Sequence, residues 1–425
     1  MDEASTCVHP SEQARPARGL TGLARSLMLG TLSGLREGCL ELRDGNTVHR
    51  FGDAASRLRA EARICDPRAY ELGAFRGEVG LGEAYVKGYW TSPDPVAVVR
   101  VAVRNLAVLD RSGGALAVVG KALARLRHLA RANDRRGSRA NIAAHYDLGN
   151  DFYRLFLDES LAYSCAFFEH ADQDLAAAQR AKFERICRKL QLGPQDHLLE
   201  IGTGWGGFAA YAARTRGCRV TTTTISREQH SHAEALFARE GLADRITLRF
   251  EDYRDLQGRF DKLVSIEMFE AVGLKFYDAY FGAVDRLLAE DGLALIQTIT
   301  MNERRFPSYI RSTDWIQQHI FPGAELASVA EILASLGRAT TLNLHHLEDI
   351  GMHYARTIQC WRAAFLANLD EVRGQGFDDA FLRMWDYYLA YCEGAFRERH
   401  IGDAQLLLSK AASTRALLDE PWEPA

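Results

Sequence analysis

The sequence predicts an α/β fold whose larger part is an open, mostly parallel sheet with helices on both faces. Two observations support this prediction. From about residue 145 onward, short apolar or β-branched runs alternate with helical stretches, and a glycine-rich turn follows the first of these runs. Such alternation is typical of parallel sheets, because each crossover helix carries the chain back to start the next strand in the same direction.

The composition is that of an ordinary globular protein. Of the 425 residues, 47% are hydrophobic and 25% are charged, which excludes a disordered, collagenous or low-complexity chain. The formal net charge of -4 gives no reason to expect nucleic acid as a partner. The eight cysteines form no CxxC motif and no zinc-ligand spacing, so we predict neither a bound metal nor a disulfide framework.

The chain divides into four segments. Residues 1–18 are polar and unpatterned, which predicts a disordered tail. Residues 19–118 predict a small N-terminal α+β domain, with a hairpin over Cys39–Phe51 that turns at Asp44-Gly45-Asn46. Residues 119–140 predict a basic linker helix, and residues 141–425 form the larger domain.

The basic segment, Lys121–Arg139, carries seven Lys and Arg side chains and one Asp. One interpretation is a solvated linker helix. The other is an anchor for anionic lipid headgroups, with each basic residue contributing about 1 kcal/mol near a membrane surface. No apolar run approaches the roughly 20 residues that cross a bilayer, and the first residues lack signal-peptide features. We therefore expect a cytoplasmic protein that is peripheral on the inner membrane surface.

Five short runs are the predicted strands of the sheet: 197–201, 218–224, 245–251, 260–266 and 292–300. After them the sequence returns to a strand-like stretch, 341–350, and then to helices rich in Trp, Tyr and Phe over 361–399. These last segments predict helical C-terminal additions to the α/β domain.

The glycine-rich turn lies in LLEIGTGWGGFAAYAA, Leu198–Ala213. Its glycines allow a ligand to approach the backbone, and the following helix offers free N–H groups. The pattern serves NAD, FAD and S-adenosylmethionine folds alike, and a simple tight turn stays possible. An acid, Glu200, precedes the first glycine by two residues. The next strand ends in Thr223–Ser226, which has no carboxylate for a ribose, so a dehydrogenase is the weaker interpretation.

Seven motifs in order then carry a resemblance. They are HYDLGNDFYRLFLDESLAYSCAFFE (145–169), LLEIGTGWGG (198–207), TTISREQ (223–229), FDKLVSIEMFEAVG (260–273), FPGAEL (321–326), HYARTI (353–358) and YLAYCEGAFRERHIGDAQLLLSK (388–410). Together they resemble the cyclopropane-fatty-acyl-phospholipid synthase family, which includes mycolic acid cyclopropane synthases and methylene-fatty-acyl-phospholipid synthases. GLGEAYVKGYW (80–90) extends the resemblance weakly into the first domain.

The resemblance implies a Rossmann-like S-adenosylmethionine-dependent methyltransferase domain. It implies transfer of a methyl(ene) carbon to the double bond of an unsaturated acyl chain in a membrane phospholipid, through a carbocation, to give a cyclopropane. A methylene- or methyl-branched product from the same family stays an alternative, as do a small-molecule methyltransferase and a catalytically silent lipid-binding protein. The first domain would support docking or a homodimer, as in the family.

The resemblance also implies site residues. The residues implied for S-adenosylmethionine are Tyr163, Ser164, Leu198, Glu200, Gly202, Gly204, Gly206, Thr224, Ile225, Ser226, Gln229, Phe250, Glu251 and Ile266. In the family a bicarbonate ion acts as the base beside the transferred methyl. The positions implied for its ligands are Cys165, Glu270, Gln297, Ile299 and Tyr354.

Two positions depart from the family pattern. Gln297 stands where the family has a His, and Ala271 replaces the His of the family's Phe-Glu-His triplet. An amide can still donate a hydrogen bond to an anion, but it cannot titrate as an imidazole does. The fate of the intermediate is therefore open between the two products.

A carbocation needs a dry pocket with aromatic walls, because water would trap it and π faces attract positive charge. Eight aromatic residues are candidates for such walls: Tyr163, Phe167, Phe168, Trp205, Phe269, Trp315, Tyr354 and Trp361. Each is individually more often part of a packed core, so we expect only some of them at the pocket.

Each ionisable candidate also has a structural interpretation. Cys165 resembles an ordinary buried thiol apart from the family match. Of two acids three residues apart beyond a predicted strand end, Glu267 and Glu270, we favour the latter, since the other could cap the following helix. His345, His346 and His353 lack the carboxylates and spacing of a metal site.

Overall fold

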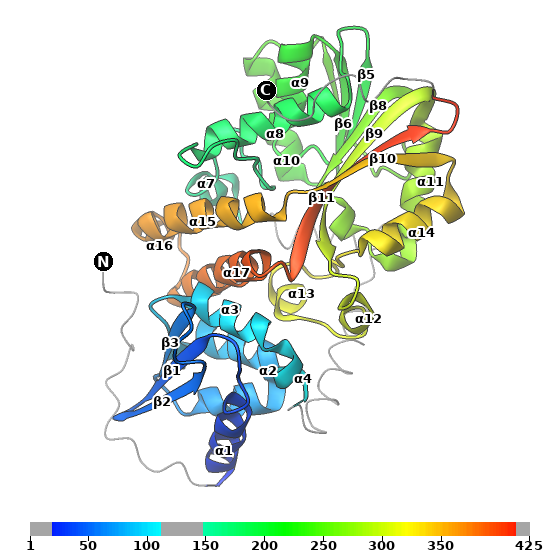
Figure 1. Cartoon of the computed structure of the whole chain (residues 1–425). Coiled ribbons are helices and arrows are strands. Elements are labelled where there is room, and N and C mark those ends of the chain that lie inside the picture. The colour runs from blue at the N-terminus through cyan, green and yellow to red at the C-terminus, as the bar shows by residue number, and fades with distance from the viewer. Residues whose placement is uncertain (1–18, 112–147, 414–425) are drawn as a thin grey trace. The chain divides into compact units, whose positions relative to one another are not determined.

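The computed structural model describes residues 19–111 and 148–413 (Figure 1). The predicted tail, 1–18, and the basic segment, Lys121–Arg139, lie outside the described residues. The chain divides into two compact units. The first comprises Met1–Ala130, Arg311–Ile320 and Trp361–His400, and the second comprises Arg131–Ile310, Phe321–Cys360 and Ile401–Ala425.

The first unit contains a four-stranded sheet in the order β2-β1-β3-β4. Its strands are β1 (Cys39–Asp44), β2 (Thr47–Gly52), β3 (Arg59–Ile64) and β4 (Trp90–Thr91). The predicted hairpin is confirmed, because β1 and β2 pair antiparallel and Asp44 lies opposite Thr47 across a two-residue loop. Gly45 in that loop has φ +58°, a conformation that glycine adopts without steric cost.

Helices from three parts of the sequence complete the first unit. They are α1 (Leu20–Leu32), α2 (Arg68–Val86), α3 (Pro95–Arg104), α4 (Leu106–Arg111), α13 (Trp315–His319), α16 (Leu369–Gly374) and α17 (Asp379–Arg397). Helix α17 packs on α2 and α3. The sequence-based boundaries placed 361–400 with the larger domain. The structure differs because the aromatic face of α17 is buried against the first unit, where the Tyr85 hydroxyl donates to Asp386 at 2.7 Å.

The second unit contains a seven-stranded sheet in the order β10-β11-β9-β8-β5-β6-β7. The strands are β5 (His197–Ile201), β6 (Arg219–Thr224), β7 (Ile246–Phe250), β8 (Phe260–Ile266), β9 (Leu288–Met301), β10 (Leu342–Asp349) and β11 (Ile401–Lys410). Strands β5 to β9 run parallel, and β10 and β11 pair antiparallel at one edge. The predicted α/β class is confirmed.

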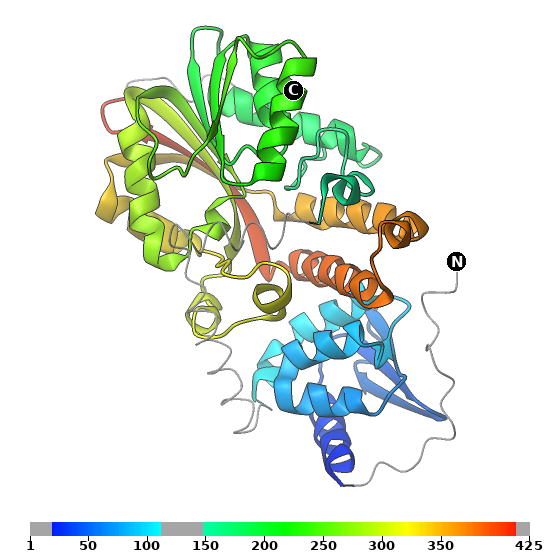
Figure 2. The ribbon, with the colours of Figure 1, turned by 180° about the vertical axis from the view of Figure 1, so that it is seen from behind.

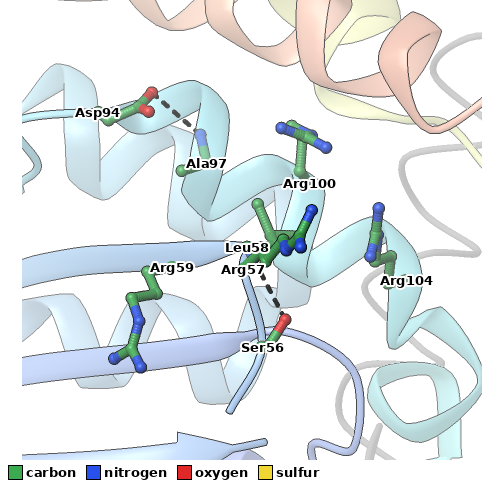
Figure 3. A pocket seen from close by; sticks show the side chains of 8 residues that line it. All are labelled: Ser56, Arg57, Leu58, Arg59, Asp94, Ala97, Arg100 and Arg104. Atoms are coloured by element: carbon green, nitrogen blue, oxygen red, sulfur yellow. Dashed lines mark hydrogen bonds between the residues drawn. The ribbon is translucent and has the colours of Figure 1, made fainter. Parts of the chain in front are cut away.

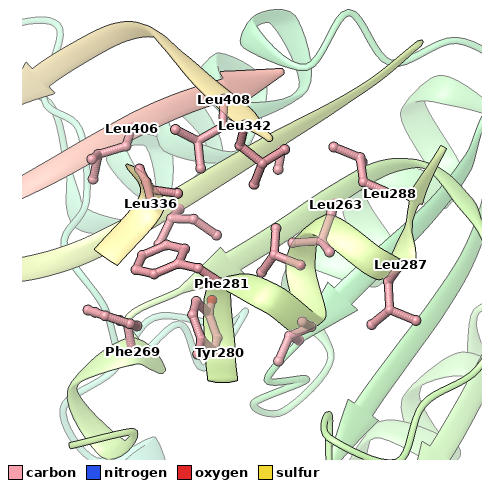
Figure 4. Close-up of a cluster of buried hydrophobic side chains, with 14 of the residues drawn as sticks. Leu263, Phe269, Tyr280, Phe281, Leu287, Leu288, Leu336, Leu342, Leu406 and Leu408 are labelled. Carbon is pink, nitrogen blue, oxygen red and sulfur yellow. The ribbon is translucent and has the colours of Figure 1, made fainter. Parts of the chain in front are cut away.

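Helices cover both faces of this sheet. The helices α8 (Leu175–Lys189), α9 (Gly207–Arg216) and α10 (Arg227–Arg239) lie on one face, and α11 (Tyr277–Leu287) and α14 (Val329–Ala339) lie on the other (Figure 1, Figure 2). Side chains alternate between these layers. Leu198 packs under α8 and α9, whereas its neighbour Leu199 packs in the aromatic cluster of α11. Figure 4 shows Phe269, Tyr280 and Phe281 of that cluster.

The second unit also contains four short helical elements and one longer helix in the part of the chain that the structure describes. They are α7 (Asn150–Arg154), η2 (Phe269–Ala271), η3 (Leu274–Phe276), α12 (Phe306–Tyr309) and α15 (Gly351–Ala367), which continues into the first unit. Among the helices that the structure describes, none is long and apolar enough to span a membrane.

Strand order reverses direction at β5. The chain adds β6 and β7 on one side of β5 and then returns to add β8 and β9 on the other side. In open α/β sheets, ligands bind outside the carboxyl ends of the strands at such a switch point. The glycine turn that follows β5 is therefore the candidate ligand site.

Candidate active site

The glycine turn after β5 has the backbone of a ligand cradle. Gly202, Gly204 and Gly206 have φ of +100°, +52° and +92°. A Cβ at Gly206 would lie 2.9 Å from the Phe237 ring, whereas a Cβ at Gly204 would have nothing within 4 Å. Packing within the protein therefore requires glycine at position 206, and open space above the turn surrounds position 204.

Glu200 lies at the end of β5, just before this turn. It is buried, and its carboxylate accepts a hydrogen bond from the Thr222 hydroxyl at 2.5 Å. Burial raises the pKa of Glu200 to about 8. A neutral Glu200 is thus the resting form at neutral pH, and a cationic ligand at the turn would favour its ionised form.

The remaining residues implied for the cofactor lie around the carboxyl ends of neighbouring strands. Ser226 caps α10 by accepting from the Gln229 N–H at 3.3 Å, and the Thr224 hydroxyl donates to the Gln229 side chain at 2.9 Å. Phe250 ends β7 with 42% of its surface exposed. The others occupy the ends of β6, β7 and β8 or the segment before α8: Ile225, Glu251, Ile266, Tyr163 and Ser164. Leu198 is fully buried in the core.

Helix α15 holds the segment that carries Cys165. The Thr357 hydroxyl accepts from the Ala166 N–H at 3.0 Å, and the His353 ring accepts from the Phe168 N–H at 3.1 Å. His353 therefore supports the backbone here, with its Nδ1 unprotonated. Cys165 is fully buried, and burial raises the pKa of its thiol well above the usual value. The thiol stays protonated and is no nucleophile.

Glu267 follows β8 and accepts hydrogen bonds from three separate segments. Its Oε1 accepts from the Cys165 N–H at 2.8 Å and from the Gln297 amide at 2.8 Å. Its Oε2 accepts from the Tyr354 hydroxyl at 2.6 Å. These contacts bring together three of the five positions that the resemblance implied for an anion site.

Glu270, on the 3-10 turn after β8, is itself one of the implied positions and binds another. Its Oε1 accepts from the Ile299 N–H and, at 3.0 Å, from the Thr298 hydroxyl. Its buried Oε2 has no hydrogen-bond partner among the described residues. Burial, together with the nearby charge of Glu267, raises the pKa of Glu270 to about 8. The FPGAEL motif contacts this turn, since the Glu325 N–H donates to the Glu270 carbonyl.

A buried polar chain lies behind Gln297, along β9 and β11. Its amide also donates to Asp403 at 3.1 Å, and it accepts from the Gln405 amide at 3.0 Å. Gln405 in turn accepts from the Lys189 ammonium at 2.7 Å, and that lysine pairs with Glu348 at 2.7 Å. The sequence prediction missed Asp403, Gln405 and Lys189. Polar residues at alternate positions of the apolar run DAQLLLS were the available signal.

Three carboxyl groups therefore lie close together. Burial raises the pKa of Asp403 well above its usual value, and the charges of Glu267 and Glu270 raise it further. Burial also raises the pKa of Glu267, but its hydrogen bonds from Tyr354 and Cys165 oppose the rise. We infer that Glu267 ionises first and that Asp403 holds its proton.

Five of the eight aromatic candidates lie at three different places. Tyr163 and Trp205 both contact Tyr153, with ring centroids 5.4 and 4.8 Å apart. Phe269 is instead fully buried in the cluster around α11 (Figure 4). Trp315 and Trp361 are fully buried residues of the first unit.

Within the residues that the structure describes, no group of three His, Cys, Asp or Glu side chains is placed to hold a metal. The site consists of a glycine turn beside β5 and of hydrogen-bonded acids beside β8 and β9. The family sequence model described as mycolic acid cyclopropane synthetase matches residues 133–406. The chain belongs to this family. It is an S-adenosylmethionine-dependent methyltransferase.

Two curated relatives of this methyltransferase are similar over most of their length. A tuberculostearic acid methyltransferase of Mycobacterium tuberculosis is 37% identical over 361 residues, which are 79% of this chain and 82% of the relative. A cyclopropane-fatty-acyl-phospholipid synthase of Escherichia coli is 37% identical over 358 residues, which are 83% of this chain and 88% of the relative.

Solved structures of cyclopropane synthases match the methyltransferase domain. The cyclopropane synthase MmaA2 of Mycobacterium tuberculosis matches with a TM-score of 0.60 and 29% identity, covering 64% of this chain and 98% of that one. The mycolic acid cyclopropane synthase CmaA1 in complex with SAH and CTAB matches with a TM-score of 0.59 and 31% identity, covering 64% of this chain and 98% of that one. A coclaurine N-methyltransferase, at 18% identity and a TM-score of 0.60, shares the fold.

Proposed function

We propose that this methyltransferase transfers a one-carbon unit from S-adenosylmethionine to the double bond of an unsaturated acyl chain in a membrane phospholipid, giving a cyclopropane. One observation carries the proposal. Segments that are distant in sequence bring Cys165, Gln297 and Tyr354 together at Glu267, the residue that follows β8. The similarity to the Escherichia coli phospholipid synthase supports the lipid substrate.

Bound S-adenosylmethionine would supply an electrophilic methyl group. The glycine turn and Glu200 would hold the cofactor beside the site. After the alkene attacks the methyl, a cation lies on the acyl chain and a proton must leave. The aromatic group of the buried Tyr153 and Trp205 and the partly exposed Tyr163 would help to exclude water and to stabilise positive charge. The acids near Gln297 are the groups that could take the proton.

The bicarbonate ion implied by the resemblance does not fit the donors in this structure. Glu267 already accepts the hydrogen bonds that Cys165, Gln297 and Tyr354 donate. Glu270 accepts the hydrogen bond that the Ile299 N–H donates. A further anion would lie against these two carboxyl groups. We therefore route no step of the proposed reaction through bicarbonate.

A second product has its own support. The Mycobacterium tuberculosis relative is named for tuberculostearic acid, and Gln297 replaces the family His. A hydride shift before loss of the same proton would give a methylene branch instead of a ring. A small-molecule methyltransferase stays the alternative that needs no lipid.

Labelled donor and unsaturated phospholipid vesicles test the proposal. We expect methyl-labelled S-adenosylmethionine to deliver its label to the fatty-acid fraction. Olefinic proton signals in the purified product would indicate the methylene branch, and cyclopropane signals would indicate the ring. Label that enters only small molecules or protein would contradict the proposal. A Glu270→Gln variant with unchanged turnover would contradict the assigned site.

We also propose that the protein binds anionic membrane surfaces peripherally. The basic segment is one candidate anchor, although it lies outside the described residues. In the first unit, a cavity of about 450 Å³ is lined by four arginines, Arg57, Arg59, Arg100 and Arg104 (Figure 3). Glu398 binds two of them, Arg100 and Arg104.

On α1, three leucines spaced for one helix face are exposed: Leu20, Leu23 and Leu27. Exposed apolar side chains and clustered arginines in one unit are suited to an anionic lipid surface.

A further inference from the structure

The Glu267 carboxylate lies where three donors from separate segments converge. The donors are the Tyr354 hydroxyl at 2.6 Å, the Gln297 amide at 2.8 Å and the Cys165 N–H at 2.8 Å. Tyr354, Gln297 and Cys165 are themselves buried. Their arrangement is a preformed site for one carboxylate-shaped anion, and a side chain of this chain occupies it.

The orientation of the Gln297 amide follows from the chain behind it. The Lys189 ammonium has only donors, so the Gln405 oxygen must face it. The Gln405 nitrogen then donates to the Gln297 oxygen, which leaves the Gln297 nitrogen directed at Glu267 and Asp403. Gln297 is therefore held as a donor to the carboxyl groups, and it cannot accept a proton from the substrate.

The backbone of Glu267 has a conformation that is unusual for a glutamate. Glu267 has φ +48°, the left-handed region that residues other than glycine, asparagine and aspartate rarely occupy. Such strain is typically found at functional sites, where surrounding contacts maintain it. Glu267 is also partly exposed, whereas Asp403 is fully buried and Glu270 is nearly so. Of these three residues, Glu267 has the largest exposed fraction, and its neighbour Met268 is partly exposed as well.

We propose that Glu267 is the base of this enzyme and that its carboxylate takes the place of the bicarbonate ion. This inference rests on the proposed function. In the proposed step, the C–H bond of the transferred methyl breaks and its proton moves to the Glu267 carboxylate. The electron pair of that bond closes the third side of the ring or, after a hydride shift, forms the methylene double bond. The positive charge that arrives with the sulfonium thus leaves as this proton.

Turnover with and without bicarbonate tests the proposal. We expect the wild-type protein, in carbonate-free buffer with S-adenosylmethionine and unsaturated phospholipid vesicles, to be as active as with added bicarbonate. Glu267→Gly should lose about 100-fold or more in turnover, the range for removal of a general base. Glycine favours the positive φ at this position, so the variant should fold. It also opens space at the same donors, so added bicarbonate or formate should restore part of the activity.

Two controls keep a structural effect separate. Glu267→Gln keeps the side-chain size and should also lose turnover, and Glu290→Gln removes an exposed carboxylate elsewhere and should leave turnover unchanged. A wild-type enzyme that stops without bicarbonate and recovers when it is added would overturn the proposal. So would full activity of Glu267→Gln.

A binding measurement distinguishes this proposal from failure of the proposed function. Line broadening of carbon-13 bicarbonate by NMR should show no binding to the wild-type protein and should show binding to Glu267→Gly. Bicarbonate bound by the wild type would overturn the proposal regardless of the substrate. Absence of any methylated lipid from the wild type, with this binding pattern intact, would instead contradict only the proposed function.

Discussion

Gln405 lies directly opposite Gln297 in the β9–β11 ladder, and its amide nitrogen donates to the Gln297 oxygen at 3.0 Å. This cross-strand pair connects the buried Lys189 to the carboxyl groups of the candidate site. Lys189 of α8 sets the orientation of the Gln405 amide, and the Gln405 amide sets the orientation of the Gln297 amide. The direction of every hydrogen bond in this row is therefore determined by the lysine.

Replacing Gln405 by Leu should release the Gln297 amide. We expect turnover to fall about tenfold, because a buried hydrogen bond of this kind is worth about 1 kcal/mol and its loss leaves unpaired groups. The KM for S-adenosylmethionine should stay unchanged, since the glycine turn is not involved. Steady-state kinetics on unsaturated phospholipid vesicles measure both.

Two variants complete that test. Gln405→Glu keeps the bond to Lys189 but presents an acceptor to Gln297, so it should also lower turnover. Gln375→Leu, at an exposed position of the first unit, should not. A fully active Gln405→Glu would show that the orientation of the Gln297 amide is unimportant.

Glu200 should make the protein less stable as the pH rises. Its pKa of about 8 in the folded state lies above the ordinary value of 4.5. The folded state therefore binds the proton more tightly, so this contribution is complete below about pH 4.5 and is lost as the pH rises toward about 8. Glu200→Gln, which is permanently neutral and can still accept from Thr222, should reduce the slope of unfolding free energy in this window by up to about 1.4 kcal/mol per pH unit.

Urea unfolding of the ligand-free protein at several pH values measures that slope. Glu228→Gln is a matched control, because it removes an exposed carboxylate from α10. Equal slopes for the wild type and Glu200→Gln would mean that Glu200 is ionised in the folded protein.

Much of this site could be predicted from the sequence. Strand β5, its glycine turn and the positions of Cys165, Gln297 and Tyr354 follow from local patterns or from the family resemblance. The role of Glu267 as the acceptor of three hydrogen bonds could not be predicted, because its donors come from segments that only the folded sheet brings together. The alternation of Asp403 and Gln405 in an otherwise apolar strand was a local signal of buried polar groups, but it did not indicate what they contact. The contact of Asp403 with the Gln297 amide on β9 is visible only in the folded structure.

The two glycines of the turn should respond differently to a methyl group. Gly206→Ala places its Cβ 2.9 Å from Phe237 at φ +92°, so we expect a loss of about 1–3 kcal/mol of stability. Gly204→Ala has nothing within 4 Å at φ +52°, so it should lose only about 1–2 kcal/mol. Yet its methyl would occupy the space where the cofactor approaches, so affinity for S-adenosylmethionine should fall at least about tenfold.

Thermal unfolding and calorimetry with S-adenosylmethionine separate the two effects. A folded Gly204→Ala that binds the cofactor as tightly as the wild type would place the cofactor away from this turn. Gly337→Ala, at a helical glycine that also has nothing within 4 Å, controls for the substitution itself.

Exposed leucines on α1 should contribute to membrane binding. Leu23 and Leu27 are 55% and 49% exposed and lie one turn apart. Replacing both by Ser removes several apolar carbons that would insert between lipids, each worth about 0.8 kcal/mol when fully buried. Sedimentation with anionic phosphatidylglycerol vesicles measures the partition coefficient of the protein. We expect this partition coefficient to fall at least about tenfold. Leu333→Ser, which removes an exposed leucine of α14 in the second unit, should leave sedimentation unchanged. Equal loss from both variants would contradict a specific role for α1.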